Sequence, residues 1–196
     1  QYIMSPKDLK TIHFMNKMMD AGVRVFKIEG RARGPEYVRT VCECYNEAIL
    51  AHLDGSYTEE KIRNWDERLA TVFNRGFWDG YYLGQRLGEW THKYGSSATR
   101  VKTHVGRVIK YFSKLGVAEL ELESGLIKEG EELLITGPTT GAVFFPAQEM
   151  RVADSIAPEI TEKGIRFSVK VPEKVRPGDR LYVMRMVEEK GKSKFL

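Results

Sequence analysis

The stretch Val23-Arg-Val-Phe-Lys-Ile-Glu-Gly-Arg-Ala-Arg-Gly-Pro35 decides how the first half of this chain folds. Its alternation predicts a β-strand with Phe26 and Ile28 on one face and Lys27 and Glu29 on the other. The Gly-Pro at its end opens a helix, because proline is tolerated at the first helical position. Opposite charges at the carboxyl end of a strand, before a crossover helix, stand where (β/α) barrels carry catalytic residues. In the alternative, Lys27 and Glu29 form an ion pair that fills a barrel interior.

Residues 1–54 are predicted to alternate between strands and helices. Residues 2–4 form a short strand, and Ser5-Pro6 is typical of a helix start, with serine as the cap. One apolar stripe at helical spacing runs on to Gly22, and a second runs from Val38 to the stop at Asp54-Gly55. This order of elements implies parallel strands joined by right-handed crossovers.

Two strand–helix units do not close a barrel, which normally takes about 250 residues. The chain begins at Gln1 without an initiator methionine, so we expect a fragment whose missing units lie in an upstream half of the same protein. A sheet of two parallel strands is marginal by itself. We therefore expect that upstream half, or a second copy of the fragment in a homo-oligomer, to cover the open strand edges.

The middle of the chain is predicted to be a connector. A helix spans residues 58–74, with Thr58 as its cap. Its predicted buried face consists of Ile62, Trp65, Leu69, Val72 and Phe73. Residues 74–84 are rich in glycine and aromatic side chains, which favours turns with aromatic anchors.

Residues 102–196 read as short strands separated by turns. The predicted strands are residues 105–112, 117–122, 132–136, 165–171 and 180–187. A turn glycine followed by an acidic residue precedes a strand twice, at Gly130 and Gly178. This pattern predicts a small closed antiparallel β-barrel, which leaves no exposed sheet edge.

The predicted fold class is therefore an α+β fragment with three parts. Residues 1–54 are the last two β/α units of a (β/α) barrel, residues 55–98 are the helical and aromatic connector, and residues 99–196 are the β-barrel domain.

Composition narrows the class of protein. The 196 residues carry a net charge of +4 with a sequence pI near 9.0, which is compatible with an anionic partner. We expect no membrane association, because no apolar run approaches the ~20 residues that span a bilayer. Cys42 and Cys44 project about 200° apart on a helix, which predicts buried free thiols in a cytoplasmic protein. The four histidines show no ligand spacing, so no metal site is predicted.

The charged loop carries the candidate site. Glu29 is the candidate general acid or base, with Lys27 tuning it as the second catalytic residue. Arg31 and Arg33 could hold a carboxylate or phosphate through bidentate hydrogen bonds, and Lys7 should approach the same rim. The alternative for the two arginines is a solvated loop.

Two further assignments stay open from the residues alone. Asp8 is read as a helix cap and not as a catalyst. Arg75, beside the aromatic residues 77–82, could bind substrate as nucleobase-stacking surfaces do, or the aromatic cluster could instead attach the barrel to its neighbour.

Four segments carry a resemblance to a known family. Residues 2–9, 20–23, 26–31 and 37–38 together resemble the carboxyl half of the collagenase-like peptidase family, which is family thirty-two of the peptidases of unknown catalytic type. The resemblance implies a modified (β/α) barrel followed by a small β-barrel. It also implies either proteolysis, including collagen breakdown, or hydroxylation of a tRNA uridine, a ribosomal RNA cytidine or the ubiquinone ring.

The resemblance also bears on cofactors. Family members are associated with prephenate and with an iron–sulfur cluster held by four cysteines. Relatives commonly carry one of these cysteines after the Asp-Leu of the Pro-Lys-Asp-Leu segment, where this chain has Lys10. An ammonium group does not replace a thiolate ligand, so the cofactor of this chain is unknown from its sequence.

The resulting functional expectation is the substrate-binding end of an enzyme that hydroxylates tRNA or rRNA, inactive as a fragment alone. The alternatives are a collagenase-like protease with a polypeptide substrate and a non-catalytic substrate-binding module.

Overall fold

A computed structural model of the chain describes residues 6–91, 95–153 and 155–187. The chain divides into two compact units, residues 1–99 and residues 100–196. Residues 55–91 therefore belong to the same unit as residues 6–54, and the proposed three-part division stays a prediction. In the described ranges, no helix is both long enough and apolar enough to cross a membrane.

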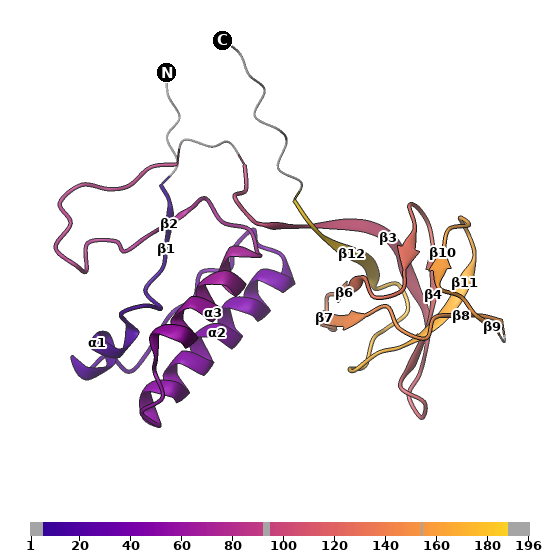
Figure 1. The fold of residues 1–196 in the computed structure, drawn as a ribbon, viewed down its shortest axis with the longest axis horizontal. Helices are drawn as coiled ribbons and strands as arrows, with labels where there is room; N and C mark the ends of the chain where they lie inside the picture. Colours follow the sequence, from indigo (N-terminus) through magenta and orange to yellow (C-terminus); the bar gives the residue numbers. More distant parts are fainter. Residues whose placement is uncertain (1–5, 92–94, 154, 188–196) are drawn as a thin grey trace, which may run out of the picture. The chain divides into compact units, whose positions relative to one another are not determined.

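Two helices form the centre of the first unit (Figure 1). The helix α2 spans Pro35–Leu53 and α3 spans Glu59–Ala70, and they lie side by side. Proline occupies the first turn of α2, as predicted, and Asp54 follows its last residue. The Thr58 side chain accepts a hydrogen bond from the backbone N–H of Lys61, which confirms the predicted cap.

The apolar faces of α2 and α3 pack against one another. The buried side chains are Val41, Cys44, Ala48 and Ala51 on α2 and Ile62, Trp65 and Leu69 on α3. The face predicted for α3 is thus confirmed at these three positions, but the helix ends at Ala70 and Phe73, beyond its end, is exposed. One assignment on α2 was wrong, because Cys44 is buried whereas Cys42 is exposed. The core-facing stripe passes through positions 41, 44, 48 and 51, which leaves position 42 on the far side of the helix.

The first predicted helix was wrong over most of its length. The helix α1 spans only Met15–Asp20, and Asp8–Leu9 form the strand β1. This strand pairs in parallel with β2, Phe77–Trp78, and backbone N–H groups of Asp8 and Lys10 donate to the carbonyls of Gly76 and Trp78. A strand partner distant in sequence thus overrides the local helix-start signal. The predicted strand 2–4 and the Ser5 cap lie outside the described residues.

The strand predicted from the decisive stretch is also absent. Residues 23–30 have no regular secondary structure, and their backbone joins no strand ladder among the described residues. Alternation signals which faces a strand would bury, but a strand forms only where a neighbour accepts and donates its backbone hydrogen bonds. The two terminal units of a (β/α) barrel therefore stay a prediction.

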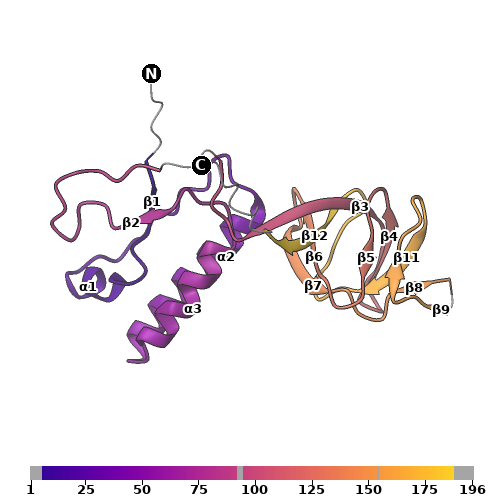
Figure 2. The ribbon, with the colours of Figure 1, turned by 45° about the horizontal axis from the view of Figure 1, so that its top comes forward.

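The second unit is built on one antiparallel sheet of eight strands. The longer strands are β3 (Arg100–Phe112), β4 (Val117–Leu122), β6 (Glu132–Gly137), β7 (Gly141–Pro146), β11 (Arg166–Lys170) and β12 (Arg180–Met186). Their order is β7-β6-β12-β3-β4-β11, extended by the short strands β8 (Arg151–Val152) and β9 (Ser155–Ile156). Figure 2 shows these strands curving around the interior of the unit. The pairings confirm an antiparallel domain, and closure of a barrel stays a prediction.

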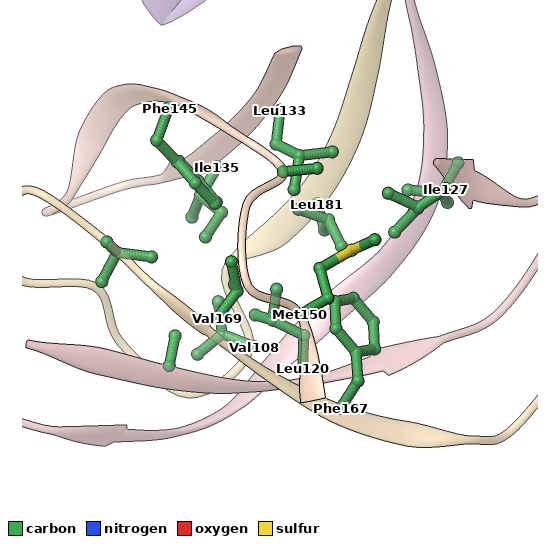
Figure 3. Close-up of a cluster of buried hydrophobic side chains, with 14 of the residues drawn as sticks. Val108, Leu120, Ile127, Leu133, Ile135, Phe145, Met150, Phe167, Val169 and Leu181 are labelled. Carbon is green, nitrogen blue, oxygen red and sulfur yellow. The ribbon is translucent and has the colours of Figure 1, made fainter. Parts of the chain in front are cut away.

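The core of the second unit lies inside this curved sheet. Figure 3 shows side chains from β3, β4, β6, β7, β11 and β12 pointing toward one another, among them Val108, Leu120, Ile135 and Leu181. All four are buried. Gly106 lets β3 approach β4 closely, because a Cβ at this position would overlap the carbonyl oxygen of Glu121.

The five predicted strands of this unit are all present, with ends shifted by a few residues. The turn glycines Gly130 and Gly178 both have positive φ, as that turn pattern requires. The prediction missed β7, whose sequence Gly-Ala-Val-Phe-Phe-Pro is bounded by two residues that usually mark loops. It also missed β8 and β9 and the two-residue pair β5 (Ile127–Lys128) and β10 (Glu159–Ile160).

Candidate functional site

The segment after α1 forms one wall of a cavity of about 560 Å³ in the first unit. A backbone hydrogen bond from Val23 to the Met18 carbonyl anchors its start. Gly30 accepts a hydrogen bond from the Arg33 N–H and closes a turn in which Ala32 has a positive φ of 56°. A non-glycine residue in this region is strained, and such strain is found preferentially at functional sites.

Charged and aromatic side chains share the cavity lining. The charged residues are Asp8, Lys10, Lys27, Glu29, Arg31 and Arg33, and the aromatic ones are Phe26, Tyr37, Tyr45, Phe73, Phe77 and Tyr82. The lining thus combines apolar and aromatic side chains with a few polar groups, which is the usual composition of a ligand site.

Lys27, Glu29 and Arg31 are exposed at this cavity. One Glu29 carboxylate oxygen accepts a hydrogen bond of 2.7 Å from the Arg31 backbone N–H. In the described part of the chain, no ion pair joins Lys27 to Glu29. Their charged groups therefore face open space, where a bound molecule would meet them, and the ion-pair alternative is not found in this unit.

Asp8 organises the arginine side of the cavity. One of its oxygens accepts from the Arg33 guanidinium at 3.1 Å, and the other accepts from the Arg75 backbone N–H at 2.9 Å. The Arg33 guanidinium also stacks over the Phe73 ring at 4.1 Å. Burial raises the pKa of Tyr37, and the Asp8 charge raises it further, while Arg33 opposes both.

For this cluster, one prediction is wrong and one alternative is not found. Asp8 is not a helix cap, because its carboxylate bridges β1 to residues that are distant in sequence. Arg33 does not lie in a solvated loop, since its side chain is only 15% exposed and is held by Asp8. Arg33 shapes the cavity through Asp8, whereas Arg31 is the arginine that is open to a ligand.

The other two predicted site residues lie outside the cavity lining. The Lys7 ammonium pairs with Glu89 at 2.5 Å, and its backbone N–H donates to the Glu89 carbonyl. Arg75 is tied to Asp8 through its backbone. The structure thus brings Lys27, Glu29, Arg31 and Arg33 together and leaves Lys7 and Arg75 beyond the lining.

Lys10 was recognised from the sequence only as a departure from the family pattern. Its ammonium group pairs with Asp66 at 2.7 Å and lies 4.9 Å from the centre of the Phe77 ring. Only 15% of the side chain is exposed, so this cation is satisfied by the protein itself. Lys10 therefore links the residue after β1 to α3 at the cavity lining.

The residues of this chain do not fit an iron–sulfur cluster held by four cysteines. Only Cys42 and Cys44 are present, on opposite sides of α2. Burial raises the pKa of the Cys44 thiol to about 11, which opposes the thiolate form that a cluster needs. In the part of the chain that the structure describes, no three His, Cys, Asp or Glu side chains could hold a metal ion together. We assign no step of the reaction to such a group here.

The aromatic lining was the least predictable part of the site. Residues 77–82 were singled out as an aromatic cluster, and two of them, Phe77 and Tyr82, do line the cavity. Phe26 was placed on one face of a strand, and Phe73 on the buried face of a helix. The signal that could have located Phe73 is its place just past the end of α3, where the helical stripe ends.

Comparison with known proteins gives one family and several relatives. The profile of Peptidase family U32 matches residues 1–92. A protein named collagenase from Porphyromonas gingivalis is 68% identical over 96% of this chain and 52% of its own length. An uncharacterized protease of Methanocaldococcus jannaschii is 37% identical over 94% of this chain and 45% of its own length.

A second group of relatives carries a different name. The tRNA hydroxylation protein P1 of Bacillus subtilis is 30% identical over 70% of this chain and 32% of its own length. This chain spans about half the length of the collagenase and of the uncharacterized protease. Among solved structures, the C-terminal domain of a Geobacillus thermoleovorans putative U32 peptidase matches 42% of this chain and 97% of its own, at 17% identity and a TM-score of 0.39.

Proposed function

Because this chain belongs to peptidase family U32, we propose that it is the carboxyl-terminal part of an enzyme that hydroxylates RNA, either tRNA or rRNA. The observation that carries this proposal is the cavity of about 560 Å³, with aromatic walls and the exposed cations Lys27 and Arg31 at its edge. Aromatic faces stack on nucleobases, and arginine binds phosphate through paired hydrogen bonds. The tRNA hydroxylation relatives, at 27–36% identity, support the same class of substrate.

Each site residue takes a role that its geometry allows. Arg31 and Lys27 bind the phosphate next to the base that enters the cavity. Glu29 accepts or donates a proton at that base, and its hydrogen bond to the Arg31 N–H orients the carboxylate. Arg33 positions the rim through Asp8. Lys7 and Arg75 contact RNA outside the cavity.

Peptide hydrolysis is the second candidate, because the collagenase from Porphyromonas gingivalis is 68% identical to this chain. In that case Glu29 would activate a water molecule, and the cavity would hold a side chain of the polypeptide. A non-catalytic module that binds substrate is the third. Under each proposal the protein is cytoplasmic. The rest of the same protein, or a second copy of this chain, completes the cavity beside residues 23–30.

The test compares modified nucleosides in cells that contain or lack the complete gene. We expect deletion to remove one hydroxylated nucleoside from tRNA or rRNA, as measured by mass spectrometry of digested RNA. Wild-type protein should restore it, and Glu29→Ala should not. Glu67→Ala is the matched control, because Glu67 is also an exposed glutamate of the first unit but lies on α3 and does not line the cavity.

An unchanged nucleoside profile after deletion would contradict RNA hydroxylation. Cleavage of collagen peptides by the purified complete protein, lost in Glu29→Ala and kept in Glu67→Ala, would then establish hydrolysis instead.

A further inference from the structure

Two arginines face each other across neighbouring strands of the second unit. Arg180 on β12 is the direct cross-strand partner of Arg107 on β3, and both side chains are exposed. Like charges in directly opposed positions destabilise a sheet. An anion close to both arginines would offset this repulsion.

The acidic side chains near this pair compensate only one of the two arginines. Arg107 contacts Glu121 at 3.0 Å and Glu123 at 3.4 Å. For the Arg180 side chain, no ion pair or hydrogen bond is found within the described residues. The adjacent acid, Asp179, is buried and accepts hydrogen bonds from Thr140 and the Arg176 backbone. Thr136 on β6, the opposite neighbour of Arg180, carries no charge.

An open cavity of about 360 Å³ lies over this pair. Its lining consists of the two arginines with His104, Glu123, Gly178 and Tyr182. The His104 ring meets the Tyr182 ring edge to face, with centres 5.4 Å apart. The Lys102 ammonium lies 5.2 Å from the centre of the same Tyr182 ring. Two arginines and two rings therefore line one concave surface, and Lys102 lies beside the Tyr182 ring.

We propose that this surface, formed by Lys102, His104, Arg107, Arg180 and Tyr182, binds a backbone phosphate of the RNA substrate between Arg107 and Arg180. The inference rests on the proposed function and extends it from the first unit to the β domain. Two guanidinium groups match the geometry of a phosphate, and the adjacent rings offer contacts to the sugar or base that follows it. RNA is favoured over an acidic polypeptide because the rings can contact a sugar or base, whereas an acidic polypeptide would use only the positive charges.

Glu123 is the acidic residue of the cavity lining, and its charge opposes binding. It lies 3.7 Å from the His104 imidazole and is shared with Arg107, so it competes with the phosphate for both. Removing its charge should strengthen binding, which gives the proposal a test in which affinity rises.

The experiment titrates the purified 196-residue chain against fluorescein-labelled total tRNA at several salt concentrations. We expect Arg180→Gln to weaken binding by roughly tenfold at 0.1 M salt and to lower the salt slope by about one, as loss of one phosphate contact predicts. Glu123→Gln should tighten binding. Arg151→Gln is the matched control, because Arg151 is an exposed arginine on β8, three strands away from β3. The affinity of this variant for tRNA should stay within twofold of the wild-type affinity.

Thermal unfolding of the same variants separates binding from misfolding. Arg180→Gln should melt at or above the wild-type temperature, because it removes a like-charge pair. Equal affinity of Arg180→Gln and Arg151→Gln would overturn the proposal, and so would displacement of tRNA by poly-L-glutamate at equal charge concentration. If cells carrying Arg180→Gln still hydroxylate RNA and the variant keeps its tRNA affinity, the inference about the β domain is overturned but the proposed function is not. If gene deletion leaves the nucleoside profile unchanged, the proposed function itself is overturned.

Discussion

At the scale of single residues, Asp8 joins parts of the first unit that are distant in sequence, because its carboxylate accepts hydrogen bonds from the Arg33 side chain and the Arg75 backbone. Its place after Ser5-Pro6 favoured a helix cap, because cap signals depend on the few nearest residues. Its actual partners, Arg33 and the Arg75 backbone, lie 25 and 67 positions away. Lys27, Glu29 and Arg31 line the same cavity and are close in sequence, so their proximity could be read from the chain. Partners that meet only through the fold gave no local signal.

Asp8→Ala should lower the free energy of unfolding by about 2–3 kcal/mol, since it leaves the Arg33 charge and the Arg75 N–H without their acceptor. Asp20→Ala is the control, because Asp20 is an exposed acid whose contact is with His52 at the surface. That change should cost less than about 1 kcal/mol. Urea unfolding measures both, and equal losses would contradict the central role of Asp8.

Cys44 predicts a specific pH dependence of stability. Burial raises the pKa of its thiol to about 11, whereas the unfolded thiol ionises near its ordinary value of 9.0. Between these values the unfolded chain has released the proton and the folded chain still holds it. The contribution of the Cys44 thiol to the free energy of unfolding is therefore fully present below pH 9. It is lost as pH rises toward 11, which lowers the free energy of unfolding by up to about 2 kcal/mol.

The matched variants are Cys44→Ala, which removes this titration, and Cys42→Ala, which removes an exposed thiol from the same helix. Unfolding free energies measured from pH 8 to pH 11 should fall more steeply in wild type and Cys42→Ala than in Cys44→Ala. Identical slopes in all three proteins would contradict this account.

At the scale of elements, helices were predicted well where their signals are local and poorly where a distant strand competes. The helices α2 and α3 carry a proline, a cap and an apolar stripe within their own sequence, and both are present. The segment 6–14 carries similar signals, yet residues 8–9 pair with β2 instead. Strands of the second unit were found because consecutive strands such as β3 and β4 pair with each other. The segment 23–30 had the alternation of a strand but no partner among the described residues.

The N-terminal cap of α3 can be tested by substitutions at Thr58. Thr58→Ala removes the oxygen that accepts the Lys61 N–H and should lower the free energy of unfolding by about 1 kcal/mol. Thr58→Ser keeps this acceptor and should cost less than half as much. Denaturant unfolding of the two variants compares them directly, and a serine variant as unstable as the alanine variant would argue against the cap.

At the scale of the whole molecule, the chain consists of two units of different construction. Residues 100–196 enclose a continuous buried core inside one sheet. Residues 1–99 have a helical core and leave large apolar side chains exposed, including Val25 at 85% and Leu87 at 83%. A domain with its own core is expected to fold independently.

Residues 100–196 expressed alone should therefore give a β-sheet circular dichroism spectrum and a cooperative thermal transition. Residues 1–99 alone should melt at a lower temperature, because the described strands of this unit, β1 and β2, have only two residues each. A disordered spectrum for residues 100–196 would show that the sheet depends on the first unit.

The central claim is that RNA enters the cavity beside residues 23–33. Photo-crosslinking tests it most directly, with benzoylphenylalanine placed at Val25 of the complete protein in cells. The control position is Leu87, which is equally exposed but does not line the cavity. We predict that RNA crosslinks at position 25 and not at position 87. Crosslinks at position 25 to polypeptide alone, or equal RNA crosslinking at both positions, would contradict the claim.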